Sequence, residues 1–195
     1  MDPITQQLFL GAAGSGVALP EIGDFYEGGY FVGFKSETQN GVATHLLIAA
    51  PRASAGSTGR NYPSSTNYNW SNAVSYASGL TINGYSDWFL PGRYELEIAY
   101  YNCKPTTASN SGISLGNNAF SVPLRSSAYT SGNPAQTSVA IFQSGGSEAF
   151  DDYSHWTGDN YNSSNAFQLE FDVGNCSFTN KVFSFPLRAF RKVAI

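Results

Sequence analysis

Few side chains in this chain of 195 residues could bind a metal ion. It has two histidines, His45 and His155, and two cysteines, Cys103 and Cys176, which stand far apart in the sequence. A zinc site needs about four nitrogen or sulfur ligands, usually at close spacing. The sequence therefore predicts no metal site and no zinc catalysis. His45 begins an apolar run, and we interpret it as a structural residue of the core or of a strand edge.

The serines and carboxylates do not form a recognisable catalytic pattern. Serine is abundant, but the sequence has no Gly-x-Ser-x-Gly turn and offers only two histidines as a base. The carboxylates that could form a glycosidase pair are Glu95, Glu97, Asp151, Asp152 and Asp159. The first two are better explained by a helix N-terminus, where negative charge is favourable. We expect no enzyme activity and no cofactor.

The polar segments offer the chemistry of a binding surface instead. They concentrate Tyr, Ser, Gly and Asn, which antibody binding sites also use. Tyrosine supplies a rigid amphipathic ring, and serine or asparagine supplies adaptable hydrogen bonds. An alternative stays open, because such loops can be merely solvated and Tyr68 or Tyr129 can belong to the core. The expected binding surface consists of Tyr129, Asn133, Trp156, Asp159, Asn160 and Tyr161.

The stretch around Trp88 is expected to organise the fold. Pro91 fixes its own backbone and holds Leu90 extended, so the chain runs straight through Trp88 and then turns. Gly92 can cap a helix, and Glu95 follows three residues later, where its carboxylate reaches back to the cap N–H. Apolar residues then recur at helical spacing. The stretch predicts a buried Trp88 followed by a short amphipathic helix.

A second helix and a buried hairpin are predicted before this stretch. Asn69 and Gly79 can cap and end a helix with apolar residues at helical spacing. Residues 30–34 and 44–50 predict a hairpin whose second strand is apolar and therefore buried on both faces. Between hairpin and helix, residues 51–68 predict a long exposed loop.

The second half of the chain predicts further strands. The apolar run 138–142 predicts one strand. The alternation in residues 167–173 and 183–189 predicts a terminal antiparallel hairpin, with Pro186 at an edge or a bulge. Residues 102–136 contain few periodic apolar positions and predict a long irregular insertion.

The residues around Trp88, Gly-Tyr-Ser-Asp-Trp-Phe-Leu-Pro and then Glu-Leu, resemble the central motif of the Lcl C-terminal domain family. This family is a C-type-lectin-like domain of bacterial adhesins and phage virion proteins. Gly92 stands where the family usually has Ser or Thr. Weaker matches are Gly-Gly-Tyr-Phe-Val-Gly at 28–33, Tyr-Ser-His-Trp-Thr-Gly-Asp at 153–159 and the segment 187–191. The resemblance implies an α+β fold, with two short helices packed on antiparallel sheet and long irregular loops.

Two chemistries of related proteins do not carry over by this resemblance. True C-type lectins bind sugars through calcium with Glu-Pro-Asn or Gln-Pro-Asp and Trp-Asn-Asp. Asn133-Pro134 and the segment from Trp156 to Asn160 match these motifs only faintly, and the acidic residue beside the proline is missing. Related oxidases that generate formylglycine use a cysteine pair whose motif this chain lacks. We expect binding without a metal.

Composition limits the partners. Charged residues make up 12% of the chain and aromatic residues 15%, so it is too aromatic for disorder and too poor in Lys and Glu for a helical bundle. A net charge of −4 argues against nucleic acid, whose phosphates need clustered Lys and Arg. No apolar run approaches the ~20 residues of a membrane span, and no basic signal-peptide region opens the chain. We expect synthesis in a cytoplasm without membrane insertion. We also expect two reduced cysteines, because disulfides are rare in a reducing compartment; a single Cys103–Cys176 bridge is the alternative.

Residues 1–20 are interpreted as an N-terminal attachment peptide with a flexible connector, ahead of a single domain at 21–195. Ile4, Leu8 and Phe9 could line one face of a short helix, and a Gly-Ala-Ala-Gly-Ser-Gly run supplies the connector. A frayed tail is the alternative. The opening Asp-Pro-Ile-Thr-Gln-Gln resembles the starts of some tailed-phage structural proteins, in which a short peptide docks into a larger assembly.

These observations and resemblances predict a non-enzymatic virion protein of a tailed phage, made in the host cytoplasm. Its N-terminal segment would bind other virion proteins, and its domain, in a homo-oligomer or in many copies, would bind a bacterial surface glycan or protein. The alternative is a capsid or tail decoration protein whose loops bind neighbouring virion subunits. A cellular adhesin is less favoured because no signal peptide is recognised.

Overall fold

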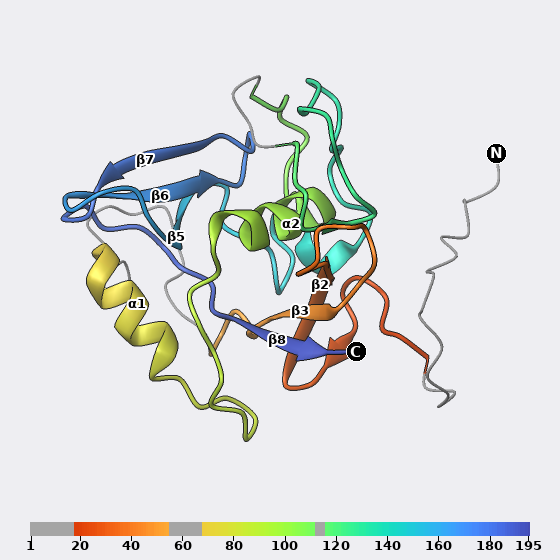
Figure 1. Cartoon of the computed structure of the whole chain (residues 1–195), viewed down its shortest axis with the longest axis horizontal. Helices are drawn as coiled ribbons and strands as arrows, with labels where there is room; N and C mark the ends of the chain where they lie inside the picture. The colour runs from red at the N-terminus through yellow and green to blue at the C-terminus, as the bar shows by residue number, and fades with distance from the viewer. Residues whose placement is uncertain (1–17, 55–67, 112–115) are drawn as a thin grey trace.

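The computed structural model describes residues 18–54, 68–111 and 116–195, and these form an α+β domain. Two α-helices and two antiparallel sheets make up its regular structure, and long irregular segments connect them (Figure 1). The predicted fold class is confirmed at this level. The attachment residues Ile4, Leu8 and Phe9 and most of the predicted loop 51–68 lie outside the described residues.

The larger sheet has the strand order β1-β2-β3-β8, and β4 also pairs with β2. The predicted hairpin is confirmed, because β2 and β3 run antiparallel with Phe31 opposite Ile48. β3 is buried on both faces, as its apolar sequence predicted. The first and last long strands, β2 and β8, flank β3. The strands of this sheet are β1 (Phe25–Tyr26), β2 (Gly29–Lys35), β3 (His45–Ala49), β4 (Ser121–Val122) and β8 (Phe190–Ala194).

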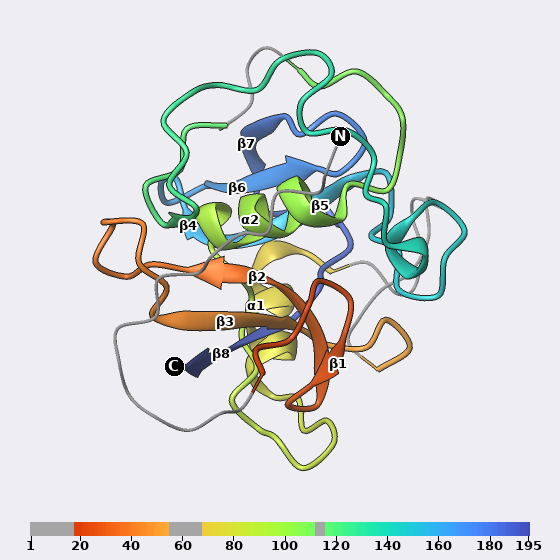
Figure 2. The same cartoon turned by 90° about the vertical axis from the view of Figure 1, so that its right-hand side faces the viewer.

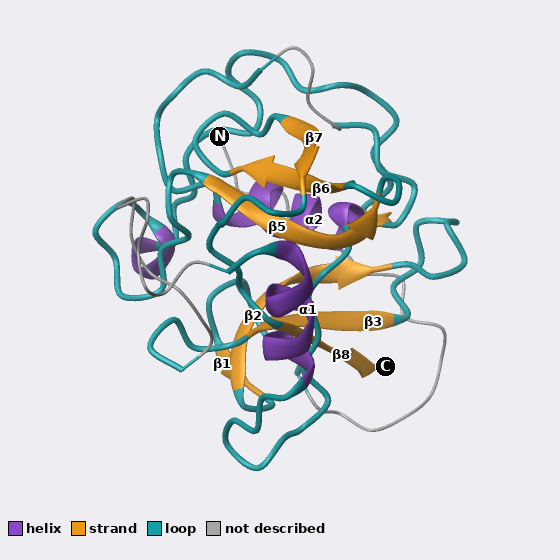
Figure 3. Cartoon of the chain, turned by 90° about the vertical axis from the view of Figure 1, so that its left-hand side faces the viewer, coloured by secondary structure: helices purple, strands orange, loops and turns teal. Residues whose placement is uncertain are grey.

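The smaller sheet consists of β5 (Ser154–Asn160), β6 (Asn165–Glu170) and β7 (Cys176–Asn180), in that order (Figure 3). The predicted pairing of 167–173 with 183–189 is wrong, because β6 pairs with β7 and the chain then returns to place β8 beside β3. The sequence of β7, Cys-Ser-Phe-Thr-Asn, is mostly polar and lacks the apolar alternation that marks a buried strand. Pro186 lies outside the strands, between β7 and β8.

The helix predicted between Asn69 and Gly79 is confirmed as α1 (Trp70–Ser78). Asn69 is its N-cap, since the Asn69 Oδ1 atom accepts a hydrogen bond from the Asn72 N–H at 2.9 Å. Gly79 follows the last helical residue, as predicted. Local capping chemistry therefore sets the N-terminal end of this helix.

The helix predicted after Trp88 is α2 (Arg93–Cys103), and Gly92 is its N-cap. The Gly92 N–H donates a hydrogen bond to Glu95 Oε2 at 2.9 Å, which is the contact that the sequence predicted. In Figure 2, α2 lies between the larger and the smaller sheet, with β2 on one side and β6 on the other. This helix therefore packs against both sheets.

One predicted strand is not formed. Residues 138–142 contain instead a short 3₁₀ helix, η1 (Ala140–Phe142), in which the Phe142 N–H donates to Val139 O at 3.0 Å. A short apolar run cannot by its periodicity distinguish a strand from a buried turn. Phe142 is nevertheless fully buried, so the run contributes to the core as its composition suggested.

The core consists of two clusters on opposite faces of the larger sheet. The α1 cluster contains Trp88 and Trp156, and the α2 cluster contains Tyr100 and Phe171. Trp88 is 2% exposed, and its indole N–H donates to Tyr85 O at 2.9 Å, so its predicted burial is confirmed. It packs with α1 and the sheet, whereas the apolar face of α2 belongs to the other cluster. Leu90 and Pro91 are also buried.

Candidate functional site

Two of the predicted binding residues are core residues. Trp156 is completely buried in the α1 cluster, and its indole N–H donates to Tyr68 O at 2.8 Å. Tyr129 is buried in the α2 cluster, where its hydroxyl donates to Glu97. The prediction that both rings lie on one exposed surface is wrong. Large aromatic side chains gain most by burial, and the core alternative left open for Tyr129 is the one that the fold adopts.

The other predicted residues reach the surface. Asp159 and Asn160 end β5, and Tyr161, which follows, is 48% exposed. Asp159 also stabilises the start of α2. Its Oδ2 atom accepts a hydrogen bond of 2.9 Å from the Arg93 N–H. Asn133 is exposed and lies in a turn of the long insertion, where its backbone is hydrogen-bonded to Thr130.

An aromatic surface that the sequence did not indicate surrounds Tyr161. The Tyr161 ring stacks on the Phe178 ring, with centroids 3.8 Å apart and planes inclined by 8°, and Phe178 is 49% exposed. Phe167 meets Tyr161 edge-on at 5.4 Å, and the Arg93 guanidinium lies 4.6 Å above the Phe167 ring. Cross-strand pairing of β6 with β7 places Phe167 opposite Phe178.

We define the aromatic surface by the residues that these contacts connect. The rings supply apolar area, while the carboxylate, amide and guanidinium at their edge supply polar groups for a ligand. Asp159 keeps 42% of its side chain exposed and Arg93 keeps 31%. The aromatic surface consists of Arg93, Asp159, Tyr161, Phe167 and Phe178, which these contacts connect, together with the exposed Asn160 beside Tyr161 in the sequence.

Glu97 organises the long insertion from inside the protein. Its carboxylate is fully buried and accepts hydrogen bonds from Tyr129 Oη, Asn118 Nδ2 and Arg125 Nη2. Burial raises the pKa of this carboxyl group, and Arg125 opposes the shift. Sequence reasoning assigned Glu97 to the charge of a helix N-terminus. That interpretation is wrong, because the side chain holds three residues of the insertion onto α2.

The other candidate acids are also engaged in the fold. Glu95 Oε1 accepts from Lys35 Nζ at 2.7 Å, and Asp151 Oδ1 pairs with Arg52 at 2.6 Å. His155 is buried against Tyr153 O, and its burial lowers the pKa of the imidazole. In the described parts of the chain, no three His, Cys, Asp or Glu side chains gather as metal ligands.

The two cysteines are free thiols, as predicted. Burial raises the pKa of the Cys103 thiol and raises that of Cys176 to about 12. The thiolate is the reactive form of cysteine, and a raised pKa suppresses it at neutral pH. These environments suit core packing rather than nucleophilic catalysis.

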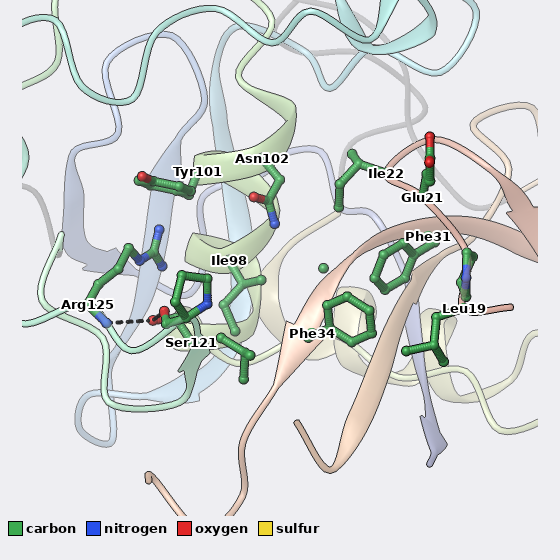
Figure 4. A pocket seen from close by; sticks show the side chains of 14 residues that line it. Leu19, Glu21, Ile22, Phe31, Phe34, Ile98, Tyr101, Asn102, Ser121 and Arg125 are labelled. Atoms are coloured by element: carbon green, nitrogen blue, oxygen red, sulfur yellow. Dashed lines mark hydrogen bonds between the residues drawn. The ribbon is translucent and has the colours of Figure 1, made fainter. Parts of the chain in front are cut away.

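A cavity of about 540 Å³ opens between α2, β2, β4 and the segment before β1 (Figure 4). Most of its lining is apolar, and the polar side chains include Asn102 and Arg125. The Asn102 amide is fixed, because its Nδ2 atom donates to Val32 O at 2.8 Å. A second cavity, of about 300 Å³, shares Ile22, Tyr101 and Asn102 with the first and is bordered by Asn133.

Two comparisons with known proteins were made, one with family models and one with curated proteins. No family model matches the chain, and a search of curated proteins finds no match. In the described residues, neither α-helix has the length and apolar character that crossing a bilayer requires.

Proposed function

We propose that this chain is a non-enzymatic virion protein of a tailed phage, whose C-type-lectin-like domain recognises a bacterial surface glycan or protein. The aromatic surface is the observation that supports this proposal most. Two large rings, Tyr161 and Phe178, are each about half exposed and are stacked on each other outside the core. Contiguous exposed apolar area of this kind typically marks an interaction site.

The polar edge of the aromatic surface suits a ligand with hydroxyl or amide groups. Arg93 presents N–H donors, Asp159 presents carboxylate oxygens, and Asn160 presents both a donor and an acceptor. Exposed aromatic faces bind the C–H faces of sugars and the apolar side chains of proteins, while neighbouring hydrogen bonds fix orientation. This combination supports recognition of either class of bacterial surface molecule.

The surroundings of the reactive groups support binding rather than catalysis. Glu95 and Glu97 are held by Lys35 and Arg125, and burial suppresses the thiolates of both cysteines. The virion assignment rests on the resemblance of the Trp88 motif and of the N-terminal opening to phage proteins. In this account residues 1–20 attach the domain to a particle, and many copies give avidity to a weak single site.

Binding of the purified full chain to host cells tests this proposal. Tyr161→Ala and Phe178→Ala should each weaken binding at least tenfold, because each removes one ring of the exposed stack. Val182→Ala is the matched control, since Val182 is 75% exposed and outside the aromatic surface, and it should bind normally. Circular dichroism should show that all three variants fold. If folded Tyr161→Ala and Phe178→Ala proteins bind cells like the parent, the aromatic surface is not the recognition site.

A further inference from the structure

The cavity beside α2 is separate from the aromatic surface and has its own chemistry. We propose that it binds a linear apolar molecule that ends in a carboxylate, such as a medium-chain fatty acid. The proposal is independent of the recognition function proposed above. It rests on the apolar walls of the cavity and on a guanidinium group at its edge whose hydrogen-bonding capacity is incompletely used.

The apolar walls fit the hydrocarbon part of such a molecule. Phe31 and Phe34 pack with their ring centroids 4.7 Å apart on one side, and Ile98 of α2 faces them. Leu19 and Ile22 contribute further apolar wall before β1. A volume of about 540 Å³ lies within the ~300–1,000 Å³ typical of small-molecule sites.

Arg125 supplies the polar end. In Figure 4, Arg125 and Tyr101 lie on one side of the cavity and the Phe31–Phe34 pair on the other, with Ile98 and Asn102 between them. The Arg125 guanidinium stacks on the Tyr101 ring at 4.0 Å, and its Nη2 atom pairs with Glu97. The cavity therefore has an apolar side and a side that carries the Arg125–Glu97 ion pair, and Glu21 also belongs to its lining.

Part of the Arg125 guanidinium has no acceptor. Its Nε and Nη1 atoms are buried, and neither has a hydrogen-bond partner within the described chain. Buried N–H groups without an acceptor are rare in folded proteins and often mark a place for an ion or ligand. Neighbouring atoms cover both nitrogens, so the proposal requires that the guanidinium rotate beneath the Tyr101 ring to present them to a carboxylate.

The charge of the site selects a single carboxylate. Glu97 already pairs with Arg125, so the two charges nearly cancel and leave little attraction for a dianion such as phosphate. A carboxylate needs only the unused N–H donors, and charge-assisted hydrogen bonds of this kind are stronger than neutral ones. The apolar walls disfavour a sugar, whose hydroxyl groups would lose water without finding partners.

Methyl NMR of the full chain titrated with decanoate tests the proposal. The Ile98 and Leu19 methyl signals should shift and saturate with one site, because these side chains line the cavity. Decan-1-ol has the same chain length without the charge and should bind at least tenfold more weakly. Equal binding of acid and alcohol would overturn the role of Arg125, and the absence of a saturable shift would overturn the site.

A substitution that fills the cavity provides a second test of the proposal. Leu19→Trp enlarges a half-buried wall residue that lies outside the helices and strands, and it should weaken decanoate binding at least tenfold. Leu124→Trp is the matched control, because Leu124 is 50% exposed and does not line the cavity, and it should leave binding unchanged. Normal binding to the Leu19→Trp protein, or decanoate shifts centred on Tyr161 and Phe178, would contradict the proposal.

Discussion

Replacing Glu97 by leucine should release the long insertion from α2 and destabilise the whole domain. The Glu97 carboxylate is fully buried and accepts hydrogen bonds from Asn118, Arg125 and Tyr129. Leucine has a similar volume but offers no acceptor. Breaking a buried ion pair by removing one partner typically costs ~3–5 kcal/mol, because the other charge is left unpaired. The Arg125 side chain is 13% exposed, so some water reaches it. We therefore expect a loss near the lower end, about 3 kcal/mol.

Urea unfolding measured by tryptophan fluorescence gives this loss. Trp70, Trp88 and Trp156 all belong to or pack against the α1 cluster, so they report global unfolding rather than release of the insertion. With a slope of ~2 kcal/mol per M urea, a loss of about 3 kcal/mol lowers the midpoint by about 1.5 M.

The double variant Glu97→Leu/Arg125→Met separates the ion pair from simple packing. It removes both charges together and should recover most of the stability that Glu97→Leu loses. Glu37→Gln is a control for loss of a partly exposed acid and should cost less than ~1 kcal/mol. A Glu97→Leu midpoint within ~0.3 M of the parent, or a double variant that loses the sum of both single losses, would refute this reasoning.

Three further predictions follow from the core, the surface charges and the N-terminus. Trp88→Ala should cost ~3–5 kcal/mol, and a variant with near-native melting would show that the Trp88 site is not a tightly packed core site. Arg191 donates two hydrogen bonds to Asp87 and lowers the pKa of that carboxyl group. Its stabilising effect is therefore present above the unfolded pKa of ~3.9 and is lost as pH falls through the folded value. In melting measurements, Asp87→Asn should be less stable than the parent at pH 7 and should converge with it at acidic pH, and a constant difference would contradict this assignment. Deleting residues 1–16 should leave the melting temperature unchanged but prevent incorporation into particles, and loss of folding would place this segment in the core.

The parts of the fold that depend on neighbouring residues could be predicted from the sequence. Asn69 and the Gly92–Glu95 pair cap their helices through contacts that span only three residues. The apolar sequence of β3 likewise required burial on both faces. The burial of Trp88 could also be predicted from its neighbours, because Pro91 holds the chain extended beside this large aromatic side chain.

The parts of the fold that depend on residues distant in the sequence could not be predicted from the sequence. β7 is a polar edge strand, and its pairing with β6 is visible only in the folded sheet. The same limit affected the candidate site, because Tyr129 and Tyr161 look alike in polar segments. Tyr129 is buried, and its hydroxyl donates a hydrogen bond to Glu97 of α2. Tyr161 is exposed directly after the last residue of β5. The resemblance around Trp88 pointed to the core rather than to the exposed rings.

Adsorption of assembled particles to host cells tests the proposed recognition most directly. Particles that carry Tyr161→Ala should assemble with normal stability but adsorb much more slowly than parent particles, and particles with Val182→Ala should adsorb normally. Trp156→Ala is unsuitable for this purpose because Trp156 is completely buried. Normal adsorption of Tyr161→Ala particles, together with reduced particle stability, would contradict host recognition and would favour a decoration protein that binds neighbouring virion subunits.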